Sequence, residues 1–240
     1  MKKWIIIVST LLLSMGIMWG NHTYKQNKIA KEVESQLESR MNRQFTVTDI
    51  RSSKDESGSY YHVTVKMAGV KKSFTFQREK EAIGNLYEYE VIEELWDRQY
   101  TQQIKEIIKG HSLNVKGVEG TFGVDSEEPI NIKNVPSSQE VRTKYGKEII
   151  INTITIHLSD NYPLEARQQE KENEKVFNLL EDLRTHNMDN NLFLDIIYKN
   201  SQQRYTITIN KHQGDKYHTP EDMKKALAKT QKQVEQTYRK

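Results

Sequence analysis

A stretch without charged side chains near the amino terminus constrains this chain most. It runs for 17 residues, from Trp4 to Gly20, and follows the basic head Met1-Lys2-Lys3. A helix of that length spans roughly 26 Å, which is close to the thickness of a bilayer core. Tryptophan stands at each end, at Trp4 and Trp19, where the interface of a membrane favours it. We therefore expect residues 1–20 to form a transmembrane segment.

This segment is either a cleaved signal peptide or a retained signal anchor. Ser14-Met15-Gly16 is its only small-x-small sequence, and the first alanine of the chain is Ala30. The poor cleavage pattern favours a retained anchor. The basic head favours a cytoplasmic amino terminus, although three lysines also follow the segment within residues 25–31. We expect a single-pass protein of the cell membrane with residues 21–240 extracytoplasmic.

The composition of the chain excludes several classes of protein. Its 36 Lys and Arg nearly balance its 33 Asp and Glu, so the formal net charge is only +3. A dedicated nucleic-acid binder carries a concentrated basic excess, and we therefore expect no nucleic-acid partner. The chain has no cysteine. Disulfides, thiol catalysis and thiolate metal sites are excluded for that reason.

Helical and strand periods alternate after the anchor. Apolar residues recur at every fourth position over 21–42, which predicts a helix. Apolar and polar residues then alternate over 45–76, which predicts about three antiparallel strands with a polar turn at 52–59. Helical period returns over 82–109, where Trp96 and Tyr100 belong to one apolar stripe and are expected in the core. We interpret residues 21–110 as an αβββα domain.

The second half of the chain predicts a further domain of the same class. Residues 111–147 read as an irregular connector with short strands, in which Gly117, Gly120 and Gly123 are expected at turns. Residues 148–240 then show the order βαββα. The first half of the expected helix over 164–185 is almost wholly polar. It is either exposed to solvent or binds a partner. The expected fold class is α+β: a transmembrane helix followed by two small α+β domains, each an antiparallel meander sheet packed on helices.

The sequence shows no catalytic motif, and we expect neither an enzyme nor a cofactor. It lacks a Gly-x-Ser-x-Gly elbow, a phosphate-binding glycine loop and a His-Glu-x-x-His pair. His212, Asp215 and His218 form the one tight group of potential metal ligands. They are weak candidates for a zinc site, because a solvated turn explains the same residues and no fourth ligand is evident.

Tyrosines gather in the first domain. Tyr87 and Tyr89 lie near the start of the helix over 82–109, and Tyr60 lies in the strand region before it. With Tyr60 they would line a groove for a peptide or a glycan if they are exposed. The alternative is that the aromatic residues of this region belong to the core.

The order of these features resembles the YfjL-like family, which comprises membrane-anchored proteins of unknown function from low-GC Gram-positive bacteria. The resemblance rests on the anchor with Lys2-Lys3-Trp4, the strand with Tyr60-Tyr61-His62, a Phe-Thr-Phe strand and the helix with Tyr87-Glu-Tyr89 and Leu95-Trp96-Asp97. It covers nearly the whole chain and implies a two-domain extracytoplasmic protein. It assigns no functional residues.

Three hypotheses about function follow. The first is a non-enzymatic binding module, held at the membrane, for an envelope protein or a cell-wall component. The second is an assembly subunit of an export or conjugation machine. The third and weakest is a metal-dependent hydrolase that uses His212 and His218.

Overall fold

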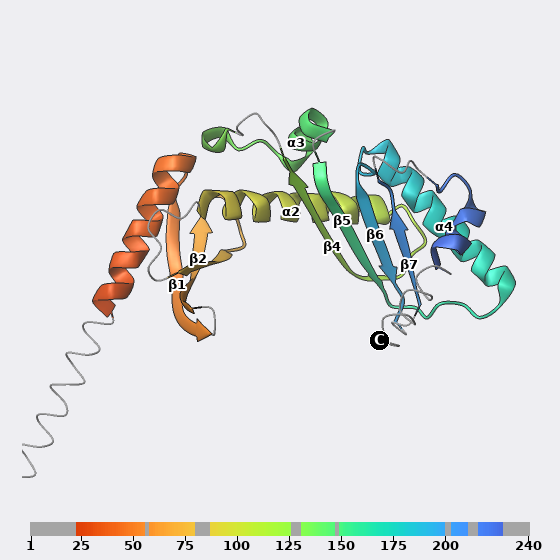
Figure 1. The fold of residues 1–240 in the computed structure, drawn as a ribbon, viewed down its shortest axis with the longest axis horizontal. Coiled ribbons are helices and arrows are strands. Elements are labelled where there is room, and N and C mark those ends of the chain that lie inside the picture. Colours follow the sequence, from red (N-terminus) through yellow and green to blue (C-terminus); the bar gives the residue numbers. More distant parts are fainter. Residues whose placement is uncertain are drawn as a thin grey trace, which may run out of the picture. The chain divides into compact units, whose positions relative to one another are not determined.

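The computed structural model describes residues 23–55, 58–79, 87–125, 131–146, 149–199, 203–210 and 216–227. The fold is α+β, as the sequence predicts, and its contacts divide it into two compact units (Figure 1). Unit 1 comprises the described residues up to Ile92 together with Asn131–Val135, which contain the short helix η1 (Ile132–Asn134). Unit 2 comprises those of Glu93–Ile130 and Pro136–Lys240. Within the described part of the chain no helix has the length and hydropathy to cross a bilayer. The anchor expected over residues 1–20 lies outside that part.

Unit 1 contains a helix over residues 23–41 and the antiparallel sheet β1-β2-β3. The strands are β1 (Phe45–Asp55), β2 (Gly58–Met67) and β3 (Phe74–Glu79). Strand β1 continues to Asp55 and β2 begins at Gly58, so most of the residues expected as a turn over 52–59 belong to strands. The four-residue spacing of Val33, Leu37 and Met41 buries one side of the helix, as predicted. They share the core of this unit with Phe45, Val63, Val65, Met67, Phe74 and Phe76.

Side chains of the same helix also satisfy the backbone of β1. Glu38 Oε1 accepts a hydrogen bond from the amide of Phe45 at 3.1 Å, and Glu34 Oε1 accepts one from Val47 at 2.7 Å. Strand β1 stands at the end of the sheet order, so these amides have no partner on a further strand. The helix thereby covers backbone groups that would otherwise invite pairing with another chain.

Unit 2 contains the four-stranded sheet β4-β5-β6-β7 (Figure 1). Its strands are β4 (Val115–Val124), β5 (Ile149–Leu158), β6 (Leu192–Ile197) and β7 (Arg204–Thr208). The expectation of an antiparallel meander is wrong here, because β5 and β6 are parallel while the other two pairs are antiparallel. Helix α4 (Ala166–Thr185) connects β5 to β6, and a helical crossover returns the chain to the same end of the sheet.

The region expected as an irregular connector contains two regular elements of unit 2. Strand β4 and helix α3 (Ser138–Tyr145) both fall within residues 111–147. Helix α2 (Tyr87–Ile108) begins in unit 1, and from Glu93 onward it belongs to unit 2. The division of the chain therefore falls within α2 and not after residue 110.

Both α2 and α4 pack against one face of the unit 2 sheet. The pairing register brings Gly120, Ile154, Leu194 and Ile207 into one row on that face. Tyr100 of α2 contacts one end of the face through Phe122, and Asn173 of α4 contacts the other end through Tyr205. Other side chains buried on this face are Val118, Ile156, Leu158, Leu192 and Ile196. On the opposite face Ile151 is 55% exposed and Phe193 is 40% exposed.

Gly120 has a different role from the turn expected of it. It lies inside β4, where an added Cβ would stand 2.4 Å from Ile104 Cδ1 and 3.0 Å from Tyr100 Cδ1 of α2. Only a glycine allows the helix to approach the strand this closely. The hydroxyl of Thr101 accepts a hydrogen bond from the Gly120 amide at 2.9 Å, which anchors the contact.

The polar first half of α4 serves the core of unit 2. Asn173 is 2% exposed, and its Oδ1 accepts a hydrogen bond from the Tyr205 hydroxyl at 2.5 Å. Glu172 Oε1 accepts one from the Tyr198 hydroxyl at 2.9 Å. These tyrosines and Tyr162 pack edge to face or tilted, with ring centroids 5.2–6.1 Å apart. The core beneath α4 contains tyrosines, and their buried hydroxyls need hydrogen-bond acceptors. Polar residues in the first half of α4 supply these acceptors.

Candidate functional site

A pocket of about 540 Å³ lies in unit 2 between α2, α3 and the carboxyl end of α4. Gln103 and Ile107 contribute from α2, and Arg142 contributes from α3. The wall from α4 and the turn after it includes Asp182, His186 and Met188. Three helices that are distant in sequence thus meet around one cavity.

Helix α3 is fixed at its start by a capping box. Ser137 Oγ accepts a hydrogen bond from the Glu140 amide at 3.2 Å, and Glu140 Oε2 accepts one from the Ser137 amide at 2.7 Å. The second bond lowers the pKa of Glu140 below its usual value. Gln99 of α2 accepts a hydrogen bond from the Ser138 amide at 2.8 Å, and Trp96 Nε1 donates to the Pro136 carbonyl at 2.8 Å. The first turn of α3 is therefore held against α2.

Arg142 is the most unusual residue of the pocket, because its charged side chain is only 4% exposed. Nη1 donates to the carbonyl oxygens of His186 and Asn187, both at 3.3 Å, and Nη2 donates to Gln103 Oε1 at 2.5 Å. The guanidinium carbon lies 4.9 Å from the centroid of the Tyr100 ring. Its contacts link α3 to α2 and to the end of α4, where the helix dipole is negative.

The charge of Arg142 is not balanced by a carboxylate within the described residues. Its contacts there are the two carbonyls, an amide oxygen and the ring of Tyr100. Nε is buried and has no hydrogen-bond acceptor. Burial lowers the pKa of the guanidinium, but an arginine stays charged in a protein. The pocket wall therefore carries a positive charge that is incompletely compensated.

A buried chain of hydrogen bonds supports this arginine from below. The Tyr100 hydroxyl donates to Asn152 Oδ1 at 2.6 Å, and Asn152 Nδ2 donates to the carbonyls of Met188 and Asn190 at 2.7 and 3.1 Å. Burial raises the pKa of the Tyr100 hydroxyl well above its usual range, so it remains a donor. The network joins α2, β5 and the turn after α4, which keeps the base of the pocket rigid.

Acidic side chains lie at the rim of the pocket. Asp182 Oδ2 lies 2.8 Å from His111 Nε2, and the side chain of Asp182 is 52% exposed. Its second oxygen, Oδ1, has no partner among the residues that the structure describes. Glu106 is already engaged by Lys109 and Gln102. Asp182 is thus the carboxylate with a free acceptor.

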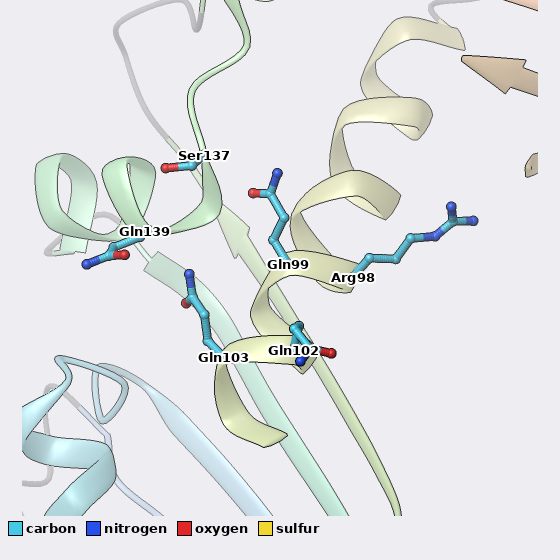
Figure 2. A pocket seen from close by; sticks show the side chains of 6 residues that line it. All are labelled: Arg98, Gln99, Gln102, Gln103, Ser137 and Gln139. Carbon is cyan, nitrogen blue, oxygen red and sulfur yellow. The ribbon is translucent and has the colours of Figure 1, made fainter. Parts of the chain in front are cut away.

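A second pocket, of about 390 Å³, lies beside the first along α2 and the start of α3. Figure 2 shows Gln99 and Gln103 extending from α2 toward α3, whereas Arg98 extends away from it. Gln103 and Gln139 line both pockets. Amide side chains, which donate and accept, therefore dominate the surface between the two helices.

The hydroxyls of the larger pocket are not arranged for nucleophilic catalysis. Thr185 Oγ1 lies 3.1 Å from His186 Nδ1, which would suit a nucleophile and its base. However, His186 Nδ1 lies 2.7 Å from the carbonyl oxygen of Asp182, and this geometry requires the proton on Nδ1. A protonated nitrogen cannot accept the proton of Thr185. The remaining threonine of the pocket, Thr143, donates to the Gln139 carbonyl.

The residues of the expected tyrosine groove are placed only in part. Tyr60 is 9% exposed, and an added Cβ at Gly58 would lie 3.3 Å from its hydroxyl, so its ring packs on the chain itself. Tyr87 and Tyr89 lie in the first turn of α2, but their side chains are outside the described residues. The groove stays a prediction for these two. Trp96 and Tyr100 are 5% and 0% exposed, which confirms that they belong to the core.

The weak metal candidates are also placed only in part. His212 and Asp215 lie outside the described residues. The amide of His218 donates to Asp222 Oδ2 at 3.1 Å, as part of the start of a helix over 220–227. Within the described ranges no three His, Asp or Glu side chains are grouped as metal ligands. The zinc hypothesis stays a prediction.

The sequence did contain one signal for the pocket. Ser137 and Glu140 have the spacing of a capping box, which predicts a helix start within the region interpreted as a connector. A helix there would have placed Arg142 near its end. Its burial, by contrast, depends on Tyr100 and His186, each more than 40 residues away in sequence.

Comparison with known proteins gives no relative for this arrangement. The chain matches no family model, no curated protein and no solved structure.

Proposed function

We propose that this chain is a single-pass membrane protein that presents a non-enzymatic binding module outside the cell. Residues 1–20 are its signal anchor, the amino terminus is cytoplasmic, and residues 21–240 are extracytoplasmic. The uncharged stretch from Trp4 to Gly20 and the absence of cysteine support this placement. The resemblance to the YfjL-like proteins of Gram-positive bacteria agrees with it.

The pocket around Arg142 is the observation that carries the proposal. Its volume of about 540 Å³ lies within the range of small-molecule sites in proteins. Its walls are mostly polar, with Ile107 and Met188 as the apolar side chains. Arg142 is fixed by its hydrogen bonds, and fixed polar groups are what orient a ligand in such a site. The network from Tyr100 through Asn152 holds the polar groups in place before any ligand arrives.

The partner belongs to the cell envelope, as either a protein or a component of the wall. The near balance of 36 basic and 33 acidic residues favours such a partner over a nucleic acid. Catalysis is not part of the proposal, because His186 cannot serve as a base for Thr185. Turnover of a cell-wall substrate by the purified full-length protein would contradict it.

Capture of the intact protein from its own membranes tests the proposal. The tagged protein is crosslinked, solubilised and purified, and both proteins and small molecules that accompany it are identified. Thr143→Trp fills the pocket from its exposed rim on α3. Gln168→Trp places the same side chain on an exposed position of α4 and serves as the control.

We expect the wild type and Gln168→Trp to enrich the same ligand, and Thr143→Trp to lose it. Enrichment that is equal in all three proteins would place binding elsewhere. No enrichment by the wild type would refute the binding module.

One observation favours assembly as a second candidate function. The face of the unit 2 sheet opposite α2 and α4 exposes Ile151 and Phe193. Exposed apolar side chains on one face are typical of protein contact surfaces. An assembly subunit of an export or conjugation machine would form a large complex in detergent extracts, and Phe193→Asp would break it. A monomer by analytical ultracentrifugation would exclude this candidate.

A further inference from the structure

The buried guanidinium of Arg142 is the feature from which a ligand class can be inferred. Placing a charge in the protein interior costs several kcal/mol unless an opposite charge accompanies it. Two carbonyls and the amide oxygen of Gln103 supply only partial negative charge. A bound carboxylate would balance the charge and accept two parallel hydrogen bonds, one from Nη2 and one from Nε, which has no acceptor among the described residues.

Gln103 occupies the position that such a carboxylate would take. Its Oε1 accepts the hydrogen bond from Arg142 Nη2 at 2.5 Å, and its side chain lines both pockets. It stands on α2 and extends into the space between the helices (Figure 2). Rotation of this side chain toward the second pocket would release Nη2 to a ligand that enters the larger one.

Asp182 provides the complementary charge in the same pocket. Its side chain is 52% exposed, and Oδ1 has no partner within the described residues, whereas Oδ2 faces His111. A cationic group on a ligand would find an acceptor there. Two carboxylates, Asp182 and Glu106, also line the pocket, and they would repel a phosphate dianion.

We propose that this pocket binds a zwitterion, namely an amino acid or a short peptide with free amino and carboxyl groups. Its carboxylate is held by Arg142 and its ammonium by Asp182, while Ile107 and Met188 contact an apolar side chain. The inference rests on the proposed binding function and names its ligand class. The opposite charges at two points of one cavity exclude simple anions and simple cations as preferred ligands.

Calorimetry with the full-length protein in detergent tests this assignment. The probes are leucine, leucylleucine, leucylleucine amide, N-acetyl-leucylleucine and inorganic phosphate. We expect one or both of the unmodified zwitterions to bind, and their comparison tells an amino-acid site from a peptide site. Amidation removes the partner of Arg142 and acetylation removes the partner of Asp182, so each weakens binding by about tenfold or more.

Three results would overturn the assignment. They are equal affinity for the amide and the free acid, tighter binding of phosphate than of either zwitterion, and no binding of any probe. A further outcome separates this assignment from the proposed function. If no probe binds but the membrane capture still enriches a ligand that Thr143→Trp loses, the binding function is supported and the zwitterionic ligand class is refuted.

A charge variant gives an independent test that does not require the removal of Arg142. Gln103→Glu places a carboxylate of the chain itself against the guanidinium. We expect this variant to melt at a higher temperature and to lose affinity for the zwitterion by about tenfold or more. Gln168→Glu makes the same charge change on the exposed surface of α4 and leaves binding unchanged. Binding by Gln103→Glu that equals the wild type would contradict the proposal.

A second variant separates the two charges of the ligand. Asp182→Asn weakens the binding of leucylleucine but leaves that of N-acetyl-leucylleucine unchanged, because the acetylated probe has no ammonium. Equal loss for both probes would show that Asp182 acts only through the structure.

Discussion

Asp97 of α2 is expected to destabilise unit 2 at neutral pH. Its carboxylate accepts a hydrogen bond from the Phe122 amide of β4 at 3.3 Å. Burial raises its pKa from 3.8 to about 6, against that hydrogen bond, and the charges of Glu94 and Glu93 add to the rise. The folded protein therefore holds a proton on Asp97 that the unfolded chain releases at a lower pH.

The sign of the pH dependence follows from this raised pKa. Between pH 4 and pH 6 the folded state binds more protons than the unfolded state, so the contribution of Asp97 to stability falls as the pH rises. The shift of about two units corresponds to about 3 kcal/mol, and partial exposure to solvent reduces this to about 1–2 kcal/mol.

Asp97→Asn is the matching perturbation, because an asparagine keeps the acceptor for Phe122 and removes the charge. We expect the variant to exceed the wild type in free energy of unfolding by about 1–2 kcal/mol at pH 8 and to equal it below pH 4. Urea unfolding followed by the fluorescence of the buried Trp96 measures both values. A variant that is less stable at pH 8, or a difference that is constant with pH, would refute the reasoning.

Three further variants test the packing of unit 2 by urea unfolding. Gly120→Ala pushes Ile104 of α2 away from β4 and is expected to lower the free energy of unfolding by about 1–3 kcal/mol. An unchanged stability would show that the contact between α2 and β4 is loose. Trp96→Ala removes a 5% exposed side chain that stacks on Phe122 and is expected to cost about 3–5 kcal/mol; a loss below about 1 kcal/mol would place the ring at the surface. Ser137→Ala breaks the capping box of α3 and is expected to cost about 1 kcal/mol of stability, with weaker ligand binding because α3 carries Arg142. Thr143→Ala removes an exposed side chain of the same helix and is expected to cost less stability; it is compared for stability alone, because Thr143 lines the pocket.

Local pattern predicts much of this fold. The period of Trp96, Tyr100 and Ile104 places one side of α2 in the core, and the structure buries all three. Apolar and polar residues also alternate along β2 and β5, where burial follows the alternation at Val63 and Ile154. Each of these elements has one buried face, so the spacing of its apolar residues predicts which face is buried.

Features that depend on distant residues were not predictable in this way. The parallel pairing of β5 and β6 depends on how α4 carries the chain back across the sheet. The local sequence pattern of either strand does not predict that path. The glycine at position 120 resembles a turn residue until Ile104 is seen against it. From the sequence, Asn173 is expected to face solvent because its helix is polar. In the structure it is buried and accepts a hydrogen bond from the Tyr205 hydroxyl.

The candidate site was hidden for the same reason. Arg142 lies in a region rich in turn residues. Of its neighbours, Gln103 comes from α2, and His186 and Asn187 come from the turn that follows α4. A single sequence shows neither the burial of an arginine nor the absence of a carboxylate beside it. The residues chosen from the sequence instead were conspicuous by type, as tyrosines and histidines are.

Photocrosslinking from the rim of the pocket in native membranes tests the central claim most directly. A photoreactive amino acid replaces Gln139 of α3, which is exposed and lines the pocket, and in a separate protein it replaces Gln168 of α4. Adducts are identified by mass after illumination. The account predicts an adduct at position 139 that excess leucylleucine suppresses, and none at position 168. No adduct at position 139, or the same adduct at both positions, would contradict it.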